Sequence, residues 1–271
     1  MEKSCIERRI ATRCRIDGLP NTDSRAIHAV DSRETLYYAK TAKCPKRRGE
    51  QNPTWLGNEL IYYYVAKLSG LKMPYSCILE VDNELAWGSE YQVGRDPIFE
   101  SVKDGGLVLA KTCNSSRIET LSLARSLLLD LALLNSDRQP WNILISGPEH
   151  QKELWFFDHD KSLLGDGRED GDLWRIHVEY DFEQKISDYF ACATANQLVF
   201  NSLTDREICA IFESLALNPE SLRSAFASCP SHWLAASLLS DLERFLLKWW
   251  KFIAEKLQQP RNYLKQRLLL G

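Results

Sequence analysis

The stretch that decides the fold runs from residue 135 to residue 145 and reads NSDRQPWNILI. It places Asp137 and Asn142 five positions apart, between a strongly apolar segment and a run of β-forming residues. This is the spacing of a phosphoryl-transfer loop, in which the Asp orients the acceptor hydroxyl and the Asn coordinates magnesium against the nucleotide phosphates. An Asp and an Asn at this spacing should occur about once by chance in a chain of this length, so the pattern needs support from its surroundings.

Three further residues stand where the same chemistry needs them. Asp158 directly follows the apolar run LWFF (154–157), which is where a second oxygen ligand for magnesium is expected. Lys40 ends a predicted strand and Glu59 lies on the helix predicted next, in the order of the lysine and glutamate that position nucleotide phosphates. Each residue alone has a simpler explanation, such as a solvated ion pair or a strand end. The ordered set favours a phosphotransferase site.

The hydrophobic periodicity predicts a small sheet with one helix, followed by a mainly helical region. The predicted strands cover 26–30, 35–40, 76–81 and 85–91, with a hairpin turn at 31–34 and a helix over 55–69 that Gly70 ends. Beyond residue 92 we expect a helix over 116–134, a hairpin formed by 142–146 and 153–157, a helix that starts with the capping box at Thr204, and a long helix over 240–258. The prediction is an α+β fold with two lobes, a small mixed-sheet lobe over 1–92 and a larger, mainly helical lobe over 93–271.

Composition excludes several other classes of protein. The 271 residues include 34 basic and 37 acidic side chains and 44% hydrophobic residues, which is typical of a globular protein and provides no general electrostatic footprint for nucleic acid or membrane. None of the eight cysteines forms the short pairs of structural zinc sites, so they are interpreted as reduced, mostly buried thiols in a cytoplasmic protein. Trp249 and Trp250 lie on a basic amphipathic helix, for which packing in the core is favoured over a membrane surface.

Two motifs carry a resemblance to a known family. DRQPWNIL (137–144) followed by LWFFDH (154–159) resembles the catalytic core of HipA-like kinases, a branch of the protein-kinase-like fold to which phosphatidylinositol 3- and 4-kinases also belong. Matching pieces are YYAK (37–40), GNEL (57–60) and AWGSEY (86–91), so the resemblance covers most of residues 20 to 165.

The resemblance implies ATP and magnesium as cofactors and assigns a role to each matching residue. Asp137 would be the catalytic base, with Asn142 and Asp158 as magnesium ligands. Lys40 would contact the α-phosphate with Glu59 as its partner. The adenine would lie near Ser89, Glu90 and Tyr91.

The sequence departs from the family pattern at two places. No glycine-rich loop precedes Lys40, and GLPNTDSR (18–25) stands in its place, so we expect backbone amides and Thr22, Ser24 or Arg25 to hold the phosphates. His159 follows Asp158 where many kinases have Phe, and a structural role for this histidine is favoured over acid–base chemistry.

These observations predict an ATP- and Mg²⁺-dependent serine/threonine protein kinase of the HipA-like group. The resemblance adds the context of a bacterial toxin–antitoxin or related regulatory system, with a protein substrate and an antitoxin or regulatory protein as partner. No direct nucleic-acid binding and no membrane association are expected. One alternative is a lipid or small-molecule kinase, because the fold does not determine the substrate. A second is a catalytically silent kinase-like interaction module, against which the complete set of Lys40, Asp137, Asn142 and Asp158 argues.

Overall fold

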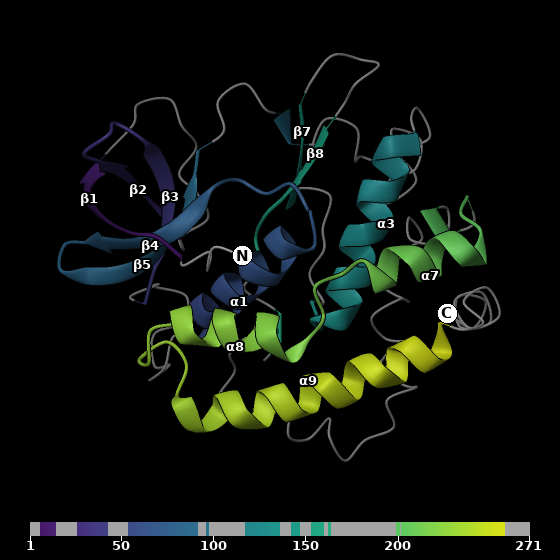
Figure 1. The fold of residues 1–271 in the computed structure, drawn as a ribbon. Coiled ribbons are helices and arrows are strands. Elements are labelled where there is room, and N and C mark those ends of the chain that lie inside the picture. Colours follow the sequence, from purple (N-terminus) through teal and green to yellow (C-terminus); the bar gives the residue numbers. More distant parts are fainter. Residues whose placement is uncertain are drawn as a thin grey trace, which may run out of the picture.

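A closed five-stranded barrel forms the N-terminal part of the protein (Figure 1). The computed structural model describes residues 6–14, 26–42, 54–91, 96–97, 117–135, 142–146, 153–159, 162–163, 199–200 and 202–257. The barrel strands are β1 (Arg8–Cys14), β2 (Ala26–Asp31), β3 (Leu36–Thr41), β4 (Ser76–Val81) and β5 (Glu84–Glu90), in the order β1-β2-β3-β5-β4. β1 pairs with β4 in parallel, and the other neighbours are antiparallel. The predicted mixed sheet is therefore present, but it closes on itself.

Small side chains allow the barrel to close. Its buried interior consists of Ala11, Ala29, Tyr37, Ala39, Cys77, Leu79, Val81 and Ala86. The alanines leave room for the larger Tyr37 and Leu79. At Gly88 on β5, an added Cβ would lie only 2.3 Å from Leu79 Cδ1, so this position of the wall has no space for a side chain.

Local turn chemistry sets the register of two hairpins. The turn predicted at 31–34 is confirmed: Asp31 Oδ1 accepts the N–H groups of Arg33 at 3.0 Å and Thr35 at 2.9 Å. Between β4 and β5, Asp82 and Asn83 have φ angles of 52° and 63°. Two successive positive φ angles are typical of the type I′ turn, whose twist matches that of the flanking strands.

β1 is a strand that the sequence analysis did not predict. Three of its seven residues are Arg, and Ile10 is 76% exposed, so the segment lacks an alternating pattern with a clear apolar face. Its pairing with β4, far along the chain, is a non-local contact. The strand is therefore formed by tertiary pairing rather than by its own pattern.

Helix α1 (Thr54–Leu68) lies between the barrel and the other helices (Figure 1). Every residue from Trp55 to Ala66 is buried, as expected of a helix that is covered on all sides. It packs against β5 and α8 (Pro219–Ser228). The predicted end at Gly70 is confirmed: Gly70 has a φ of 73°, and the Leu71 N–H donates back to the Ala66 carbonyl at 3.0 Å.

The remaining elements surround α3 (Arg117–Ala132), which contacts α7 (Asp205–Glu213), α9 (Ala236–Lys256) and β8 (Glu153–Phe156). β8 pairs with β7 (Ile143–Ser146), and β7 pairs with β6 (Asp96–Pro97). The capping box predicted at Thr204 is present. The long helix begins at 236 rather than at the predicted 240. Its N-cap residue, Ala235, makes no side-chain capping hydrogen bond, so no capping motif in the sequence marks this start.

The two tryptophans of α9 belong to the core, as predicted. Trp249 is fully buried, and Trp250 is 5% exposed. Their indole N–H groups donate to the carbonyls of Leu131 at 3.0 Å and Ala132 at 2.8 Å, at the C-terminal end of α3. The two indoles thus satisfy carbonyls that the end of a helix leaves without an intrahelical donor.

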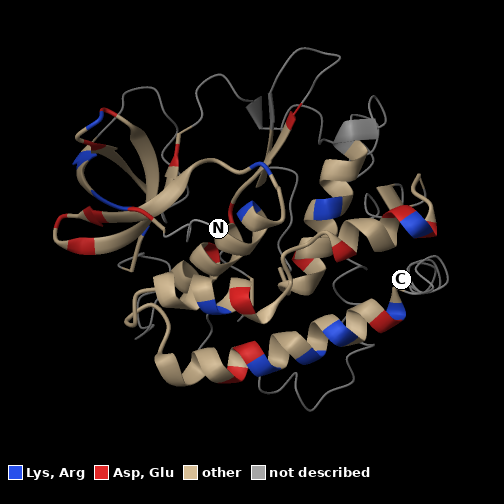
Figure 2. Ribbon diagram, viewed as in Figure 1, with Lys and Arg blue, Asp and Glu red and all other residues tan. Residues whose placement is uncertain are grey.

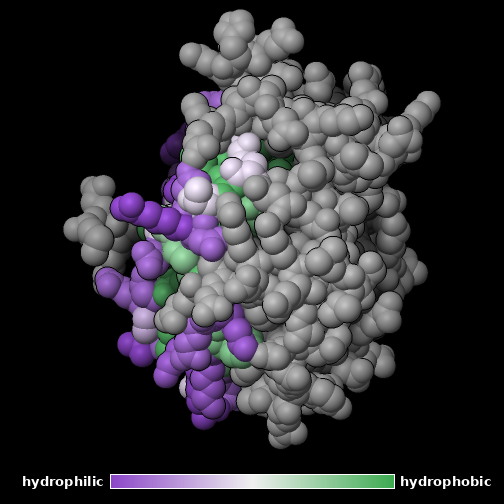
Figure 3. Space-filling view, turned by 90° about the vertical axis from the view of Figure 1, so that its right-hand side faces the viewer, coloured by the Kyte–Doolittle hydropathy of each residue, from purple (hydrophilic) through white to green (hydrophobic). Residues whose placement is uncertain are grey.

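The described surface carries both signs of charge. Acidic and basic residues both lie along α9 (Figure 2), and small hydrophobic areas lie among hydrophilic residues on the face in Figure 3. Among the described cysteines, Cys77 is buried but Cys14, Cys209 and Cys229 are partly exposed free thiols, so the expectation of mostly buried thiols is wrong for these positions. The helices of the described ranges include none with the length and apolarity to span a membrane.

Candidate functional site

Three side chains from separate elements meet in one ion cluster. Lys40 Nζ on β3 donates to Glu59 Oε1 on α1 and, at 2.6 Å, to Asp158 Oδ1 after β8. The exposed fractions of these side chains are 16% for Lys40, 4% for Glu59 and 35% for Asp158. Burial lowers the dielectric around Glu59, so its interaction with Lys40 is less screened than that of a surface ion pair.

The second oxygen of Glu59 connects α1 to the residue after Asp158. Glu59 Oε2 accepts the His159 backbone N–H at 3.0 Å. Asp158 has a φ of 59°, in the left-handed region that Asp tolerates better than most residues. The chain therefore turns sharply after β8 while Glu59 holds both the Lys40 ammonium and the His159 amide.

His159 has a packing role, in agreement with the structural interpretation. Its side chain is 1% exposed, and its ring lies flat on the Tyr62 ring, with centroids 3.8 Å apart and an interplanar angle of 10°. Such a stack fills the core beside the ion cluster.

Asn142 lies beside the residue that precedes Asp158. The Phe157 N–H donates to the Asn142 carbonyl at 3.2 Å, which extends the antiparallel register of β7 and β8. Asn142 is 2% exposed. Because Asn142 precedes β7 and Asp158 follows β8, the two predicted magnesium ligands come from the same end of one hairpin.

The described ranges hold no cluster of three or more His, Cys, Asp or Glu side chains that could bind a metal ion. A metal centre built from protein carboxylates and imidazoles alone is therefore not found there. The oxygen donors of Asn142 and Asp158 suit Mg²⁺, which usually takes only one or two protein ligands together with phosphate oxygens and water.

Of the residues predicted to lie near the adenine, Ser89 and Glu90 lie on opposite faces of β5. Ser89 is paired with Tyr38, two residues before Lys40, so these three side chains share one face of the barrel wall. Glu90 is paired with Tyr37 and points to the other face. The N–H groups of Glu90 and Tyr91 donate to the carbonyls of Tyr75 and Leu36 at 2.8 Å each, so a base would meet other groups of these residues.

Aromatic residues on the Lys40 face are a feature that the sequence analysis missed. Tyr38 makes ring contacts with Tyr91 and His28, at centroid distances of 5.2 Å and 5.1 Å. Burial, followed by the neighbouring Tyr91, raises the pKa of the Tyr38 hydroxyl. The sequence could have indicated this feature, because side chains alternate between the two faces of a strand, and Tyr38, two positions before Lys40, must share its face.

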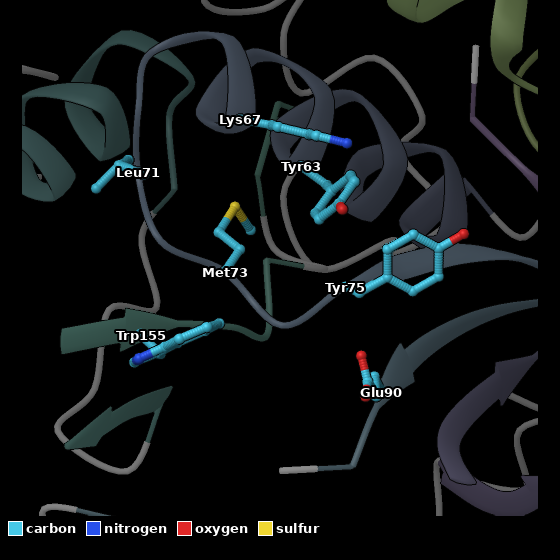
Figure 4. Close-up of a pocket in the computed structure, with 7 residues that line it drawn as sticks. All are labelled: Tyr63, Lys67, Leu71, Met73, Tyr75, Glu90 and Trp155. Carbon is cyan, nitrogen blue, oxygen red and sulfur yellow. The ribbon is translucent and has the colours of Figure 1, made fainter. Parts of the chain in front are cut away.

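Of two neighbouring hollows, the smaller one adjoins the ion cluster. A small inner cavity is lined by Glu59, Asp158 and Ser89, among others. An open pocket of about 460 Å³ lies next to it, with Met73 between Tyr63 and Trp155 (Figure 4). Tyr63 and Met73 line both hollows, so they form the wall between them.

Four of the predicted site residues, Asp137, Thr22, Ser24 and Arg25, lie outside the described residues. The structure thus brings together Lys40, Glu59 and Asp158, places Asn142 directly before β7 and Ser89 on the same barrel face as Lys40, and places Glu90 on the opposite face, where it lines the open pocket.

The chain was compared with known proteins. No family model and no curated protein matches it. A structure of the Helicobacter pylori proinflammatory kinase CtkA is similar over 93% of this chain and 99% of its own, with 14% identity and a TM-score of 0.51. A chain in the Shewanella oneidensis MR-1 toxin–antitoxin complex of HipA, HipB and operator DNA is similar over 93% of this chain and 67% of its own, with 12% identity and a TM-score of 0.54. At these identities the likeness concerns the fold, and this chain has a mixed α/β fold similar to that of kinase-like proteins.

Proposed function

We propose that this chain is an ATP- and Mg²⁺-dependent serine/threonine protein kinase of the HipA-like group. The observation that carries the proposal is the meeting of Lys40, Glu59 and Asp158. Phosphoryl transfer needs a cation for the phosphates, a carboxylate that positions that cation, and a second carboxylate for the metal ion. A solvated surface pair would leave Glu59 exposed, whereas its side chain is 4% exposed.

Each residue of the proposed site has a distinct task. Lys40 donates hydrogen bonds to phosphate oxygens, and Glu59 holds the ammonium group in place. Asn142 and Asp158 supply oxygen ligands for Mg²⁺, which when bound neutralises charge on the phosphates. Asp137 orients the acceptor hydroxyl, and Thr22, Ser24 and Arg25 contact the phosphates.

The base of the nucleotide is proposed to lie against the barrel face that carries Tyr38 and Ser89. The Tyr38 ring offers a flat surface for stacking, and the Ser89 hydroxyl, which is 3.0 Å from Ser76 Oγ, can donate or accept a hydrogen bond. Tyr91, whose ring contacts that of Tyr38, lies at the edge of this face, whereas Glu90 points to the opposite face.

We propose a protein hydroxyl as the acceptor and an antitoxin or other regulatory protein as the partner. Support comes from the two similar structures, one of a kinase and one of a toxin–antitoxin system. With a formal net charge of -3, the chain itself is not proposed to bind nucleic acid.

The test is phosphate transfer from γ-labelled ATP with Mg²⁺, by the purified chain alone and with a cell extract. Asp137→Ala and Asp158→Ala are the test variants, and Asp241→Ala on the surface of α9 is the matched control. We expect label on a specific protein in the wild type and in the control, and none in the two test variants. Melting curves should show that Asp158→Ala is folded, because this side chain is 35% exposed and contributes little to the core.

Other outcomes select the alternatives. Label on lipid or on a small molecule, but not on protein, would select the lipid or small-molecule kinase. Binding of ATP without transfer to any acceptor would select the silent interaction module. Absence of both ATP binding and transfer would contradict both kinase hypotheses and leave only the silent interaction module.

A further inference from the structure

Tyr62 on α1 contacts two residues that lie far from each other in the sequence, His159 and Asp130. Its side chain is fully buried. One face of its ring stacks on His159, the residue next to Asp158. Its hydroxyl donates to Asp130 Oδ1 on α3 at 2.7 Å. A single side chain thus joins the segment that bears Asp158 to the interior of another helix.

Asp130 continues this connection toward the predicted catalytic loop. Asp130 Oδ1 also accepts a hydrogen bond from Asn135 Nδ2 at 2.7 Å, and the Asn135 N–H donates to the Asp130 carbonyl at 2.8 Å. Asp130 and Asn135 are 5% and 4% exposed. Asn135 lies just beyond the end of α3, two positions before Asp137. One carboxylate oxygen therefore receives donors from α1 and from the start of that segment.

Burial of the Asp130 carboxylate carries a desolvation cost, in a helix that is otherwise rich in leucine. Leu127, Leu128, Leu129 and Leu131 surround Asp130 in the sequence, and an apolar residue at its position would avoid the desolvation of a charge. Hydrogen bonds to a charged acceptor are short and directional, so they determine relative position more tightly than apolar packing does. The hydrogen bonds of Asp130 are therefore suited to hold Tyr62 and Asn135 in a fixed relative position.

We infer that Tyr62 is a positioning residue, which through His159 and Asp130 keeps the Lys40–Glu59–Asp158 cluster in register with Asn135, two positions before Asp137 in the sequence. The inference rests on the proposed function, because the cluster and Asp137 must act on the same phosphoryl group. Reacting groups that are displaced by a fraction of an ångström lose much of the advantage of orientation. Tyr62 touches neither nucleotide nor acceptor in this scheme, and it acts through its neighbours.

The kinetic test compares Tyr62→Phe with Tyr64→Phe. Tyr62→Phe removes the hydroxyl that reaches Asp130 but keeps the ring that stacks on His159. Tyr64 is on the same helix and is 6% exposed, so Tyr64→Phe is a matched control for the loss of a buried hydroxyl. For Tyr62→Phe we expect kcat to fall at least tenfold and the KM for ATP to change less than twofold, because the hydroxyl that is removed contacts Asp130 and the Lys40–Glu59 ion pair stays in place. The control should retain kcat within twofold.

A purely structural role would give a different result. In that case both variants would lower the melting temperature and kcat to similar extents, or Tyr62→Phe would raise KM and leave kcat unchanged. Either result would overturn the inference.

A second measurement is independent of catalysis and separates failure of this inference from failure of the proposed function. Hydrogen exchange of the His159 and Asn135 backbone amides reports the two ends of the connection, since each donates one of the hydrogen bonds described above. Tyr62→Phe should accelerate exchange of both amides at least fivefold, and Tyr64→Phe should accelerate neither. Acceleration of one amide alone, or of neither, would refute the coupling even in a chain that transfers no phosphate.

Discussion

Replacing Lys40 by Met tests whether the ion cluster is a buried unit. The substitution keeps an unbranched side chain of similar length and removes the ammonium group from Glu59 and Asp158. Removing one partner of a buried ion pair typically destabilises a protein by about 3–5 kcal/mol, because the other charge stays buried without its partner. Since Lys40 is 16% exposed, we take the lower end, about 3 kcal/mol, for the contact with Glu59. The contact with Asp158 is more exposed and adds at most about 1 kcal/mol.

The sum predicts a loss of about 3–4 kcal/mol, which corresponds to a fall in melting temperature of roughly 6–16 °C for a chain of this size. The double variant Lys40→Met/Glu59→Gln should recover at least half of the loss, because Gln carries no charge and its amide oxygen still accepts the His159 N–H. This recovery distinguishes a buried unpaired charge from lost packing, which a second substitution would not restore.

Urea unfolding at 25 °C, followed by tryptophan fluorescence, measures all four members of this cycle. Equal m-values across the cycle would show that the variants unfold from comparably compact states. A loss below 1 kcal/mol for Lys40→Met, together with additive effects in the double variant, would refute the reasoning. Lys40 and Glu59 would then be a solvated pair despite their burial in the structure.

Three further predictions concern the framework of the site. Gly88→Ala should destabilise the barrel by about 1–3 kcal/mol through overpacking against Leu79, whereas Gly57→Ala, whose nearest new contact is at 3.3 Å, should change the unfolding free energy less; equal effects would contradict the tight barrel wall. Trp250→Phe should lower the free energy of unfolding by about 1–3 kcal/mol in the same urea assay, because the Ala132 carbonyl loses its buried donor, and a change below about 0.5 kcal/mol would show that this bond is dispensable. The hydrogen bond from Arg9, followed by that from Tyr75, lowers the pKa of Glu7 from 4.5 to about 2, so its contribution to stability is complete above pH 4.5 and is lost as the pH falls toward 2. Wild type should therefore lose more stability than Glu7→Gln across this range, and parallel pH profiles would remove Glu7 as a cause.

Several local features of the fold follow from the sequence alone. The range of β4, the turn at Asp31 and the capping box at Thr204 follow from side-chain period and from local hydrogen bonding, which act over a few residues. The order of Lys40, Glu59, Asn142 and Asp158 led to the prediction of a phosphotransferase site, and the structure brings Lys40, Glu59 and Asp158 into contact. Their roles in catalysis stay predictions until the variants are assayed.

Tertiary structure decided the features that depend on contacts between distant segments. β1 is a strand because it pairs with β4, and the barrel closes because Gly88 and the interior alanines leave room for Leu79 and Tyr37. The sequence of β1 has no periodicity that would predict its pairing with β4. The start of α9 at 236 was likewise not predicted, because no capping side chain marks its first residue.

The same distinction between local sequence patterns and contacts of distant segments applies within the site. The sequence placed Tyr38 beside Lys40 on one strand, but only the structure brings Tyr91 and His28 to its ring. The contacts of Tyr62 with His159 and Asp130 join residues about a hundred and about seventy positions apart. Side-chain patterns report which face of an element is buried, whereas the partners on that face are chosen by packing of the whole chain.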